Sequence, residues 1–112
     1  ATLQTIKPWA LRDPDHSDGQ AVTAPVGQFE PNAWGLRDMH GNVAEWTSSV
    51  YLPYPYAADN AHESPEAAGP RVVRGGSFDD RPRRVRSAFR LSYLPDFRVY
   101  NVGFRVVCDA RP

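Results

Sequence analysis

The stretch NAWGLRDMHGNVAEW, residues 32–46, is the most informative part of the chain. It contains two carboxylates, Asp38 and Glu45, and Gly41 and Val43 can turn their backbone carbonyls toward them. A hard cation such as calcium prefers several oxygen ligands of this mixed kind, and a glycine permits a tight turn around the ion. The other interpretation is that both carboxylates cap turns and accept hydrogen bonds from nearby backbone N–H groups. The spacing alone favours this second, structural interpretation.

Short stretches further along the chain predict strands rather than helices. Residues 71–74 read RVVR and are followed by two glycines, residues 84–91 alternate in hydrophobicity, and residues 103–109 alternate again. The 8 glycines and 11 prolines indicate long loops and few long helices, and residues 53–70 have the composition of a surface excursion. The predicted fold class is therefore irregular α+β. A length of 112 residues suits one domain spanning residues 1–112.

The balance of 13 basic and 13 acidic residues hides two halves of opposite charge. Residues 1–70 hold three bases and nine acids, for a charge of −6, whereas residues 71–112 hold ten arginines and four aspartates, for +6. The halves either pair with each other, which is favoured, or present an arginine-bearing ligand surface. No apolar run approaches the roughly 18 residues of a membrane span. The single cysteine, Cys108, excludes an internal disulfide and a multi-cysteine zinc site, but it does not fix the compartment.

Five motifs in order make the chain resemble the formylglycine-generating enzyme, or sulfatase-modifying factor, superfamily. They are PVGQFEPNAWGL (residues 25–36), GNVAEW (41–46), RVVRGGSF (71–78), RSAFR (86–90) and NVGFRV (101–106). The resemblance implies a C-type-lectin-like fold with a small twisted antiparallel sheet, long loops and calcium as a structural ion. It also implies that the chain is the C-terminal portion of a longer one. The residues that match the family's calcium sites by position are Asp38, Gly41, Val43 and Glu45 for one ion, and Asp18 and Gln20 for part of a second.

The resemblance does not carry the family's oxidase activity to this chain. That activity uses two copper-binding cysteines shortly after the Gly-Gly-Ser motif, where this chain reads FDDRPRRV, residues 78–85. Thiolates select copper(I), and aspartate does not replace them, so we expect no copper and no oxidase chemistry. Cys108 is interpreted as a small core residue at a strand end, and His40 as a structural hydrogen-bonding residue. The alternative function is the C-terminal part of a formylglycine-generating-type oxidase whose active-site residues lie elsewhere.

Residues 74–105 are similar to the variable region of diversity-generating retroelement proteins, which use the same lectin-like fold. Those proteins diversify chosen positions by adenine-directed mutagenesis, which does not yield Lys, Gln, Glu, Met or Trp. None of these five residue types occurs in residues 71–112, whereas the twelve in residues 1–70 would predict about seven there. The resemblance implies a non-catalytic protein that displays a diversified ligand-binding surface. The candidate variable positions are Asp79, Asp80, Arg81, Arg84, Phe89, Leu91, Ser92, Tyr93, Leu94, Phe97, Val99 and Tyr100.

Aliphatic and aromatic side chains are frequent among these candidate positions. The run LSYL, residues 91–94, precedes Pro95 in expected loop sequence, and Phe97 and Tyr100 follow closely. Rigid aromatic side chains on a scaffold provide contact area at low entropic cost, so the expected partner is a protein or another surface ligand. The alternative is that these residues pack a small core, and we expect Phe89 and Val99 to do so.

Ten arginines with aromatic residues between them also suggest nucleic-acid binding as a third function. The zero net charge and the single lysine argue against a phosphate-binding footprint, so nucleic acid is disfavoured as a partner. We expect instead that the arginines of the matched framework pair with acids of the first half. These arginines are Arg74, Arg86, Arg90, Arg98 and Arg105.

Overall fold

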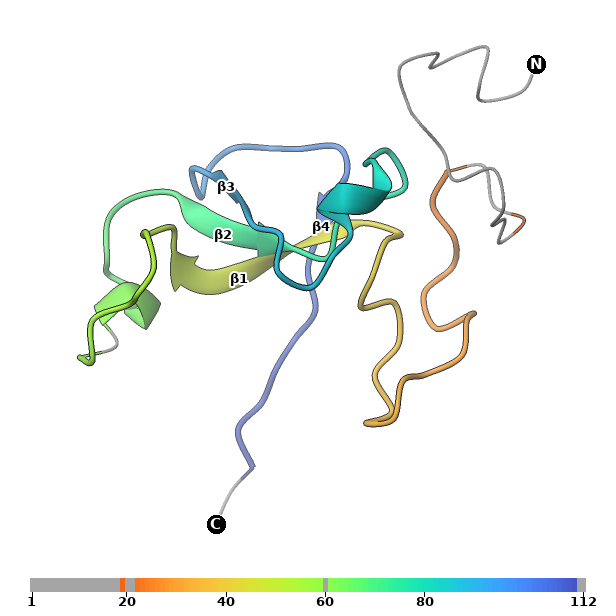
Figure 1. Cartoon of the computed structure of the whole chain (residues 1–112), viewed down its shortest axis with the longest axis horizontal. Coiled ribbons are helices and arrows are strands. Elements are labelled where there is room, and N and C mark those ends of the chain that lie inside the picture. The colour runs from red at the N-terminus through yellow and green to blue at the C-terminus, as the bar shows by residue number, and fades with distance from the viewer. Residues whose placement is uncertain (1–18, 20–21, 60, 111–112) are drawn as a thin grey trace.

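The computed structural model describes residues 19, 22–59 and 61–110. A small four-stranded sheet lies at its centre, in the order β3-β2-β1-β4 (Figure 1). Long irregular segments connect the strands, so the predicted irregular α+β architecture is confirmed. None of the helices in the described ranges has the length and apolarity needed to cross a membrane. The elements are β1 (Ala44–Val50), the 3-10 turn η1 (Ala61–Glu63), β2 (Arg71–Arg74), the 3-10 turn η2 (Pro82–Arg84), β3 (Leu91–Tyr93) and β4 (Val102–Gly103).

The sheet is mixed. β2 pairs antiparallel with β1 and with β3, as expected, but β4 runs parallel to β1, with Ala44 opposite Val102 and Glu45 opposite Gly103. The parallel pair arises because residues 94–101 carry the chain from β3 at one edge of the sheet to β4 at the other (Figure 1). Residues 44–45, in the second of the five motifs, and residues 102–103, in the last, are therefore neighbours in space.

The strand expected at residues 71–74 is confirmed, whereas the one expected at residues 84–91 is wrong. Pro82 begins η2, in which the Val85 N–H donates to the Pro82 carbonyl at 3.0 Å, and β3 begins only at Leu91. Proline presets helical backbone angles at the start of a turn, and this local preference overrides the alternating pattern. Residues 91–93, expected as a loop, form the edge strand β3 instead.

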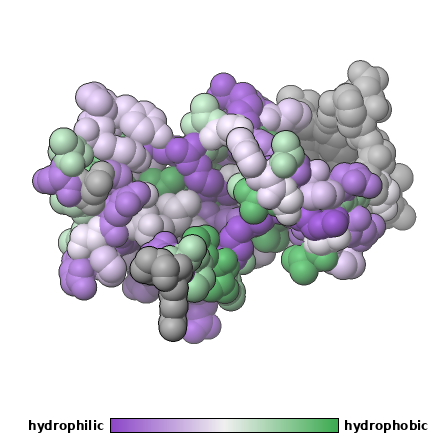
Figure 2. Space-filling view, turned by 90° about the horizontal axis from the view of Figure 1, so that it is seen from below, coloured by the Kyte–Doolittle hydropathy of each residue, from purple (hydrophilic) through white to green (hydrophobic). Residues whose placement is uncertain are grey.

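The chain after β4 leaves the sheet, so the strand expected at residues 103–109 is wrong beyond Gly103. An alternating pattern forms a strand only where a neighbouring strand is available, and in the described part of the chain β4 is an edge. Phe104 is 78% exposed and Val106 is 86% exposed, and Cys108 is exposed rather than part of a core. Hydrophobic atoms gather beside this C-terminal end of the chain (Figure 2).

The buried core is small and lies on β1 and β2. Its hydrophobic residues among the described ones are Ala44, Val50, Val72 and Val73, and Val73 is 1% exposed. Val73 stands opposite Trp46 of β1 and Leu91 of β3, so the three side chains form a row across the sheet. With so few buried aliphatic residues, the long loops must be held by other contacts.

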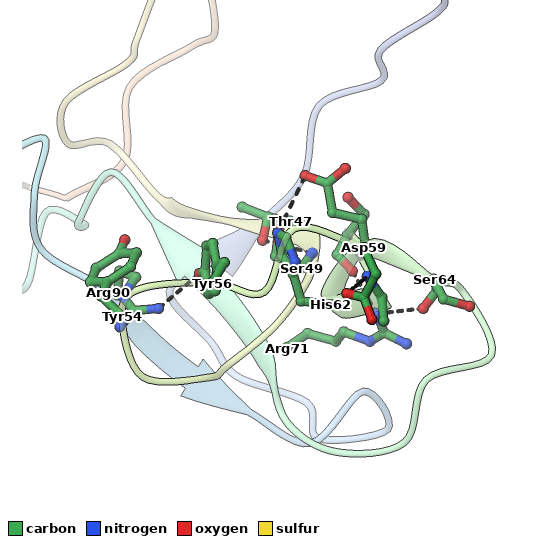
Figure 3. A network of polar contacts seen from close by, with 12 residues as sticks. Thr47, Ser49, Tyr54, Tyr56, Asp59, His62, Ser64, Arg71 and Arg90 are labelled. Carbon is green, nitrogen blue, oxygen red and sulfur yellow. Dashed lines mark hydrogen bonds and ion pairs between the residues drawn. The ribbon is translucent and has the colours of Figure 1, made fainter.

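Arginine side chains fasten these loops to the sheet. The Arg71 guanidinium donates to the carbonyls of Ser48 in β1 and of Ser64, Pro65 and Ala67 in the surface excursion, at distances between 2.5 and 3.1 Å (Figure 3). A guanidinium carries five N–H donors, so one side chain can satisfy several carbonyls that an irregular segment leaves unpaired. Arg71 therefore supplies the carbonyls of the excursion with the hydrogen-bond donors that a neighbouring strand would supply in a sheet.

Arg90 holds the other end of the same excursion. It donates to the Leu52 carbonyl and to the Tyr56 hydroxyl, both at 2.9 Å, and its guanidinium lies 3.9 Å from the ring centroid of Tyr54 (Figure 3). The Tyr56 ring in turn stacks on His62 of η1, with ring centroids 4.0 Å apart. His62 is 8% exposed, so this stack forms a second, aromatic core outside the sheet.

The expected pairing of framework arginines with acids is confirmed only for Arg105, which binds Glu45. It is wrong for Arg74, Arg86 and Arg90, which donate to backbone carbonyls and tyrosine hydroxyls. Arg98 is exposed and has no acidic partner among the described residues. The reason is that irregular segments contain many carbonyls without a strand partner, and these compete with carboxylates for the guanidinium donors.

Candidate functional site

The first candidate site is the loop of residues 38–45, which we call the acidic loop. Asp38, Gly41 and Asn42 adopt positive φ angles of 55°, 92° and 62°, so the backbone turns sharply. Asp and Asn tolerate this left-handed region better than other side chains, which explains their presence here. The Gly41 N–H donates to the Gly75 carbonyl and the Phe78 N–H to the Asn42 carbonyl, both at 2.8 Å. The acidic loop is thus fixed against the Gly-Gly-Ser motif.

Both carboxylates of the acidic loop have partners within the protein. One oxygen of Asp38, Oδ2, accepts the Gly27 N–H at 2.8 Å. The two oxygens of Glu45 accept hydrogen bonds from Nε and Nη2 of Arg105, at 2.6 and 2.7 Å. Arg105 Nη2 also donates to the Asp38 carbonyl at 3.1 Å. One arginine therefore links the two acidic residues.

The structure brings the residues of the first predicted calcium site, Asp38, Gly41, Val43 and Glu45, into this one loop. Asp38, Val43 and Glu45 line a cleft of about 440 Å³ together with Arg105. Asp18 and Gln20, predicted for the second site, lie outside the described residues. His40 is a structural hydrogen-bonding residue, as predicted, because its Nδ1 lies 2.7 Å from the Val85 carbonyl oxygen. The calcium ion stays a prediction of the family resemblance.

Substitution of the acidic loop's carboxylates is expected to destabilise the fold. We predict that Asp38→Ala and Glu45→Ala each lower the free energy of unfolding by about 1 to 2 kcal/mol, because charge-assisted hydrogen bonds to Gly27 and Arg105 are lost. Thermal melts followed by circular dichroism measure the change. The exposed Glu30→Ala serves as control and should leave the melting temperature unchanged. Equal melting temperatures for all three variants would show that these carboxylates have no structural role.

The second candidate site is the segment of residues 79–100, which holds the predicted variable positions and which we call the display segment. Some of its charged residues bind the framework. Asp80 Oδ2 accepts both the backbone N–H and the hydroxyl of Ser77 at 2.8 Å, and its side chain is 8% exposed. Arg84 lies 3.5 Å from the other Asp80 oxygen and 5.8 Å from the ring centroid of Phe89. Asp80 therefore stabilises the segment from a buried position, whereas Arg84 contacts it with a side chain that is 42% exposed.

Three large hydrophobic side chains of the display segment are exposed, among exposed charged residues such as Arg81 and Arg98. Leu94 is 56% exposed, Phe97 59% and Tyr100 73%. The half-buried Tyr93 ring stacks parallel to Phe97, with centroids 6.0 Å apart, and meets Trp46 of β1 edge-on at 6.2 Å. The result is a row of three rings that runs from the sheet outward to the display segment.

This row of rings borders a shallow groove of about 410 Å³. The groove is lined by Trp46, Thr47 and Ser48 of β1, Arg71 of β2, and the loop prolines Pro65 and Pro95. The sequence did not single out Trp46 or Arg71 as site residues. Trp46 could have been predicted as a site residue, because period-two alternation in β1 places it on the same face as Val73 of β2. From that face its ring reaches Tyr93 of the edge strand β3.

The remaining candidate positions are divided between surface and interior. Arg81 is exposed, and Asp79 and Ser92 are half-buried. Phe89 and Val99, expected to pack inward, are half-buried, so that expectation holds in part. Residue type does not separate the exposed from the half-buried positions, since an arginine, an aliphatic residue and an aromatic residue occur in each group.

Tyr100, although 73% exposed, makes one polar contact within the display segment. Its hydroxyl donates to Asp79 Oδ2, and its ring meets Phe78 edge-on with centroids 6.4 Å apart. The hydrogen bond to the Asp79 carboxylate is the main cause that raises the pKa of Tyr100 to about 12. Folding therefore favours the neutral phenol over the phenolate at this position.

The raised pKa of Tyr100 predicts a distinct titration. We expect Tyr100 to ionise near pH 12 when phenolate absorbance is followed. Because the folded pKa exceeds the unfolded value of about 10, the contribution to stability is complete below pH 10 and is lost as the pH rises through 12. Asp79→Asn should lower the pKa of Tyr100 toward the ordinary tyrosine value of about 10. A wild-type protein in which no tyrosine ionises near pH 12 would contradict the assignment.

The sheet, the acidic loop and the display segment together define a lectin-like scaffold of the kind found in variable proteins. Treponema denticola variable protein 1 has the same fold with a TM-score of 0.64 and 29% sequence identity, over 79% of this chain and 32% of that protein. The model of the sulfatase-modifying factor enzyme 1-like domain matches residues 4–110. The chain therefore belongs to this family, as its five motifs predict.

Relatives within the family include proteins named as active and as inactive. The formylglycine-generating enzyme of Streptomyces coelicolor is 41% identical over 98 residues, which are 83% of this chain and 31% of that protein. The inactive C-alpha-formylglycine-generating enzyme 2 of Mus musculus is 35% identical over 99 residues, 83% of this chain and 28% of that protein. The chain thus spans about a third or less of the length of these relatives.

Proposed function

We propose that this chain is a non-catalytic binding module that presents the display segment to a ligand on a lectin-like scaffold. Three findings support the proposal. The fold is shared with a variable protein, and the family contains a relative named as inactive. Residues 78–85, where the resemblance would place a pair of copper-binding cysteines, contain none. The only cysteine, Cys108, follows β4 in the exposed tail.

The observation that carries the proposal is the exposure of Leu94, Phe97 and Tyr100 in one short segment. Single exposed hydrophobic residues are normal on protein surfaces, but several close together mark an interaction site. The adjacent Asp80 and Arg84 are engaged with each other and with the framework. The display segment therefore offers exposed apolar and aromatic side chains next to exposed arginines, which suits a protein partner whose epitope has an apolar centre.

The scaffold beneath the display segment is braced independently of the exposed side chains. Arg74 donates to the Ser87 carbonyl at 2.7 Å, Arg90 donates to the Leu52 carbonyl, and Asn101 Nδ2 donates to Ser77 Oγ at 2.8 Å. The three donating residues, Arg74, Arg90 and Asn101, belong to the motifs of the family resemblance, and none of these contacts involves a candidate variable position. The exposed side chains can therefore change while the backbone keeps its place, which is the property that diversification by a retroelement requires.

A pair of combinatorial libraries tests the proposal. The first randomises Leu94, Phe97 and Tyr100, and the matched control randomises Tyr51, Tyr54 and Tyr56, which surround Arg90. We expect most members of the first library to fold, with losses below about 1 kcal/mol, and to yield binders to a chosen protein target. Most members of the control library should be degraded by protease. Loss of folding throughout the first library would show that these residues are core rather than display.

The 41% identity to a formylglycine-generating enzyme favours a second candidate function, part of a related oxidase. An assay of copper(I) binding, and of oxygen consumption with a cysteine-containing peptide, separates the two functions. We expect neither copper binding nor turnover, and a Cys108→Ser variant controls for oxidation of the protein's own thiol. Clear turnover that survives this substitution would overturn the non-catalytic proposal.

A further inference from the structure

We propose that the guanidinium of Arg105 takes the place of the cation in the acidic loop, so that the loop is stable without calcium. The family resemblance implies calcium at Asp38, Gly41, Val43 and Glu45. The contacts of these residues show which cation the described chain already supplies to them.

Most of the carboxylate oxygens that a calcium ion would need are engaged by protein donors. Both carboxylate oxygens of Glu45 accept from Arg105, and the same guanidinium binds the Asp38 carbonyl. Asp38 Oδ2 accepts the Gly27 N–H. Calcium requires about six to eight oxygen ligands at about 2.3–2.6 Å, and three of the four carboxylate oxygens of Asp38 and Glu45 already accept hydrogen bonds from Gly27 and Arg105. The ligand set as arranged therefore does not fit calcium.

The same arrangement fits a guanidinium. Arg105 approaches Glu45 with two N–H groups on two oxygens, the fork geometry that makes arginine–carboxylate pairs strong and directional. Its third contact, to the Asp38 carbonyl, lies in the loop that carries the positive φ angles. The Arg105 and Glu45 side chains are 33% and 21% exposed, so water screens the pair only in part.

The position of Arg105 gives this contact a structural consequence. Arg105 follows β4 by two residues, and Glu45 lies opposite Gly103 in the parallel pair of β1 and β4. β4 has only two residues, so its own strand hydrogen bonds hold it weakly. The ion pair therefore holds the chain after β4 against β1 and joins it to the acidic loop.

Thermal melts with calcium and with chelator test the inference on the whole chain. We expect millimolar calcium or excess EDTA to leave the melting temperature of the wild type unchanged. Arg105→Gln should lower it by about 5–10 °C, and calcium should restore part of that loss because the Glu45 oxygens are released. Calcium should have no such effect on the Glu45→Gln/Arg105→Gln double variant. Arg98→Gln, an exposed arginine, is the control and should melt like the wild type.

Three results would overturn the inference. The first is a wild type whose melting temperature rises by several degrees with calcium and falls with EDTA, since calcium would then be the resident cation. The second is an Arg105→Gln variant that melts like the wild type. The third is a destabilised Arg105→Gln variant on which calcium has no effect. If Arg105→Gln does not fold, the wild-type titration and the milder Arg105→Lys variant, expected to melt between the wild type and Arg105→Gln, decide the question.

Discussion

Replacement of Gly76 by alanine is expected to lower the free energy of unfolding by about 3 kcal/mol. Gly76 has a φ of 67°, which costs an L-residue about 1–2 kcal/mol. A Cβ atom there would stand 2.9 Å from the Arg84 carbonyl oxygen and 2.9 Å from Val85 Cγ2. Because the Arg84 neighbour is backbone at the end of η2, it cannot rotate away, and overpacking adds about 1–3 kcal/mol. Urea unfolding measures the loss.

Gly35 provides the matched control for this substitution. Its φ is 79°, but a Cβ atom at Gly35 would meet no heavy atom within 4 Å. Gly35→Ala should therefore show the backbone cost alone, about 1 kcal/mol, and the difference between the two variants isolates the contact with η2. Equal losses at Gly35 and Gly76 would show that the display segment does not pack on the Gly-Gly-Ser motif as described.

Replacement of Arg90 by methionine is expected to cost about 2 to 3 kcal/mol. Methionine keeps much of the packing volume but loses the hydrogen bonds to the Leu52 carbonyl and the Tyr56 hydroxyl. It also loses the cation–π contacts with Tyr51 and Tyr54, whose ring centroids lie 4.6 and 3.9 Å from the guanidinium. Urea unfolding measures the stability, and the near-ultraviolet circular dichroism of the tyrosines should weaken.

Arg98→Met is the control for the arginine at position 90. Arg98 lies in the same display segment and is exposed, so its replacement should change the unfolding free energy by less than about 0.5 kcal/mol. Comparable losses at both positions would mean that the tyrosines around Arg90 do not brace the surface excursion. An unchanged tyrosine signal in Arg90→Met would lead to the same conclusion.

The parts of the fold that the sequence predicted are those set by local chemistry. The tight acidic loop follows from Asp38, Gly41 and Asn42, residue types that tolerate positive φ, and the end of β2 follows from the glycine pair after Arg74. The position of β3 was missed because a three-residue strand is determined by its partner β2 and not by its own pattern. The parallel pairing of β4 with β1 is likewise determined by the path of residues 94–101 across the sheet, and the residue types of Val102 and Gly103 do not indicate it.

The sequence predicted which residues belong to the candidate site, but not which of them bind the framework and which are exposed. Asp79 and Asp80 are adjacent and chemically identical, yet Asp80 binds Ser77 whereas Asp79 binds the exposed Tyr100. Charge counting indicated that arginines meet acids of the first half, and Arg105 does so. It could not show that the acid is a predicted calcium ligand, because that contact joins residues 60 positions apart.

Deep sequencing of codons 74–105 in the gene, from many cells of its source population, shows whether the display segment is diversified. We expect substitutions concentrated at the display positions, above all Leu94, Phe97 and Tyr100, and restricted to residue types that adenine-directed mutagenesis yields. The codons of Gly76 and Arg90 should stay constant, and a near-identical template copy should lie beside a reverse transcriptase gene. Variation spread evenly over the chain, with no such template, would contradict a diversified binding surface.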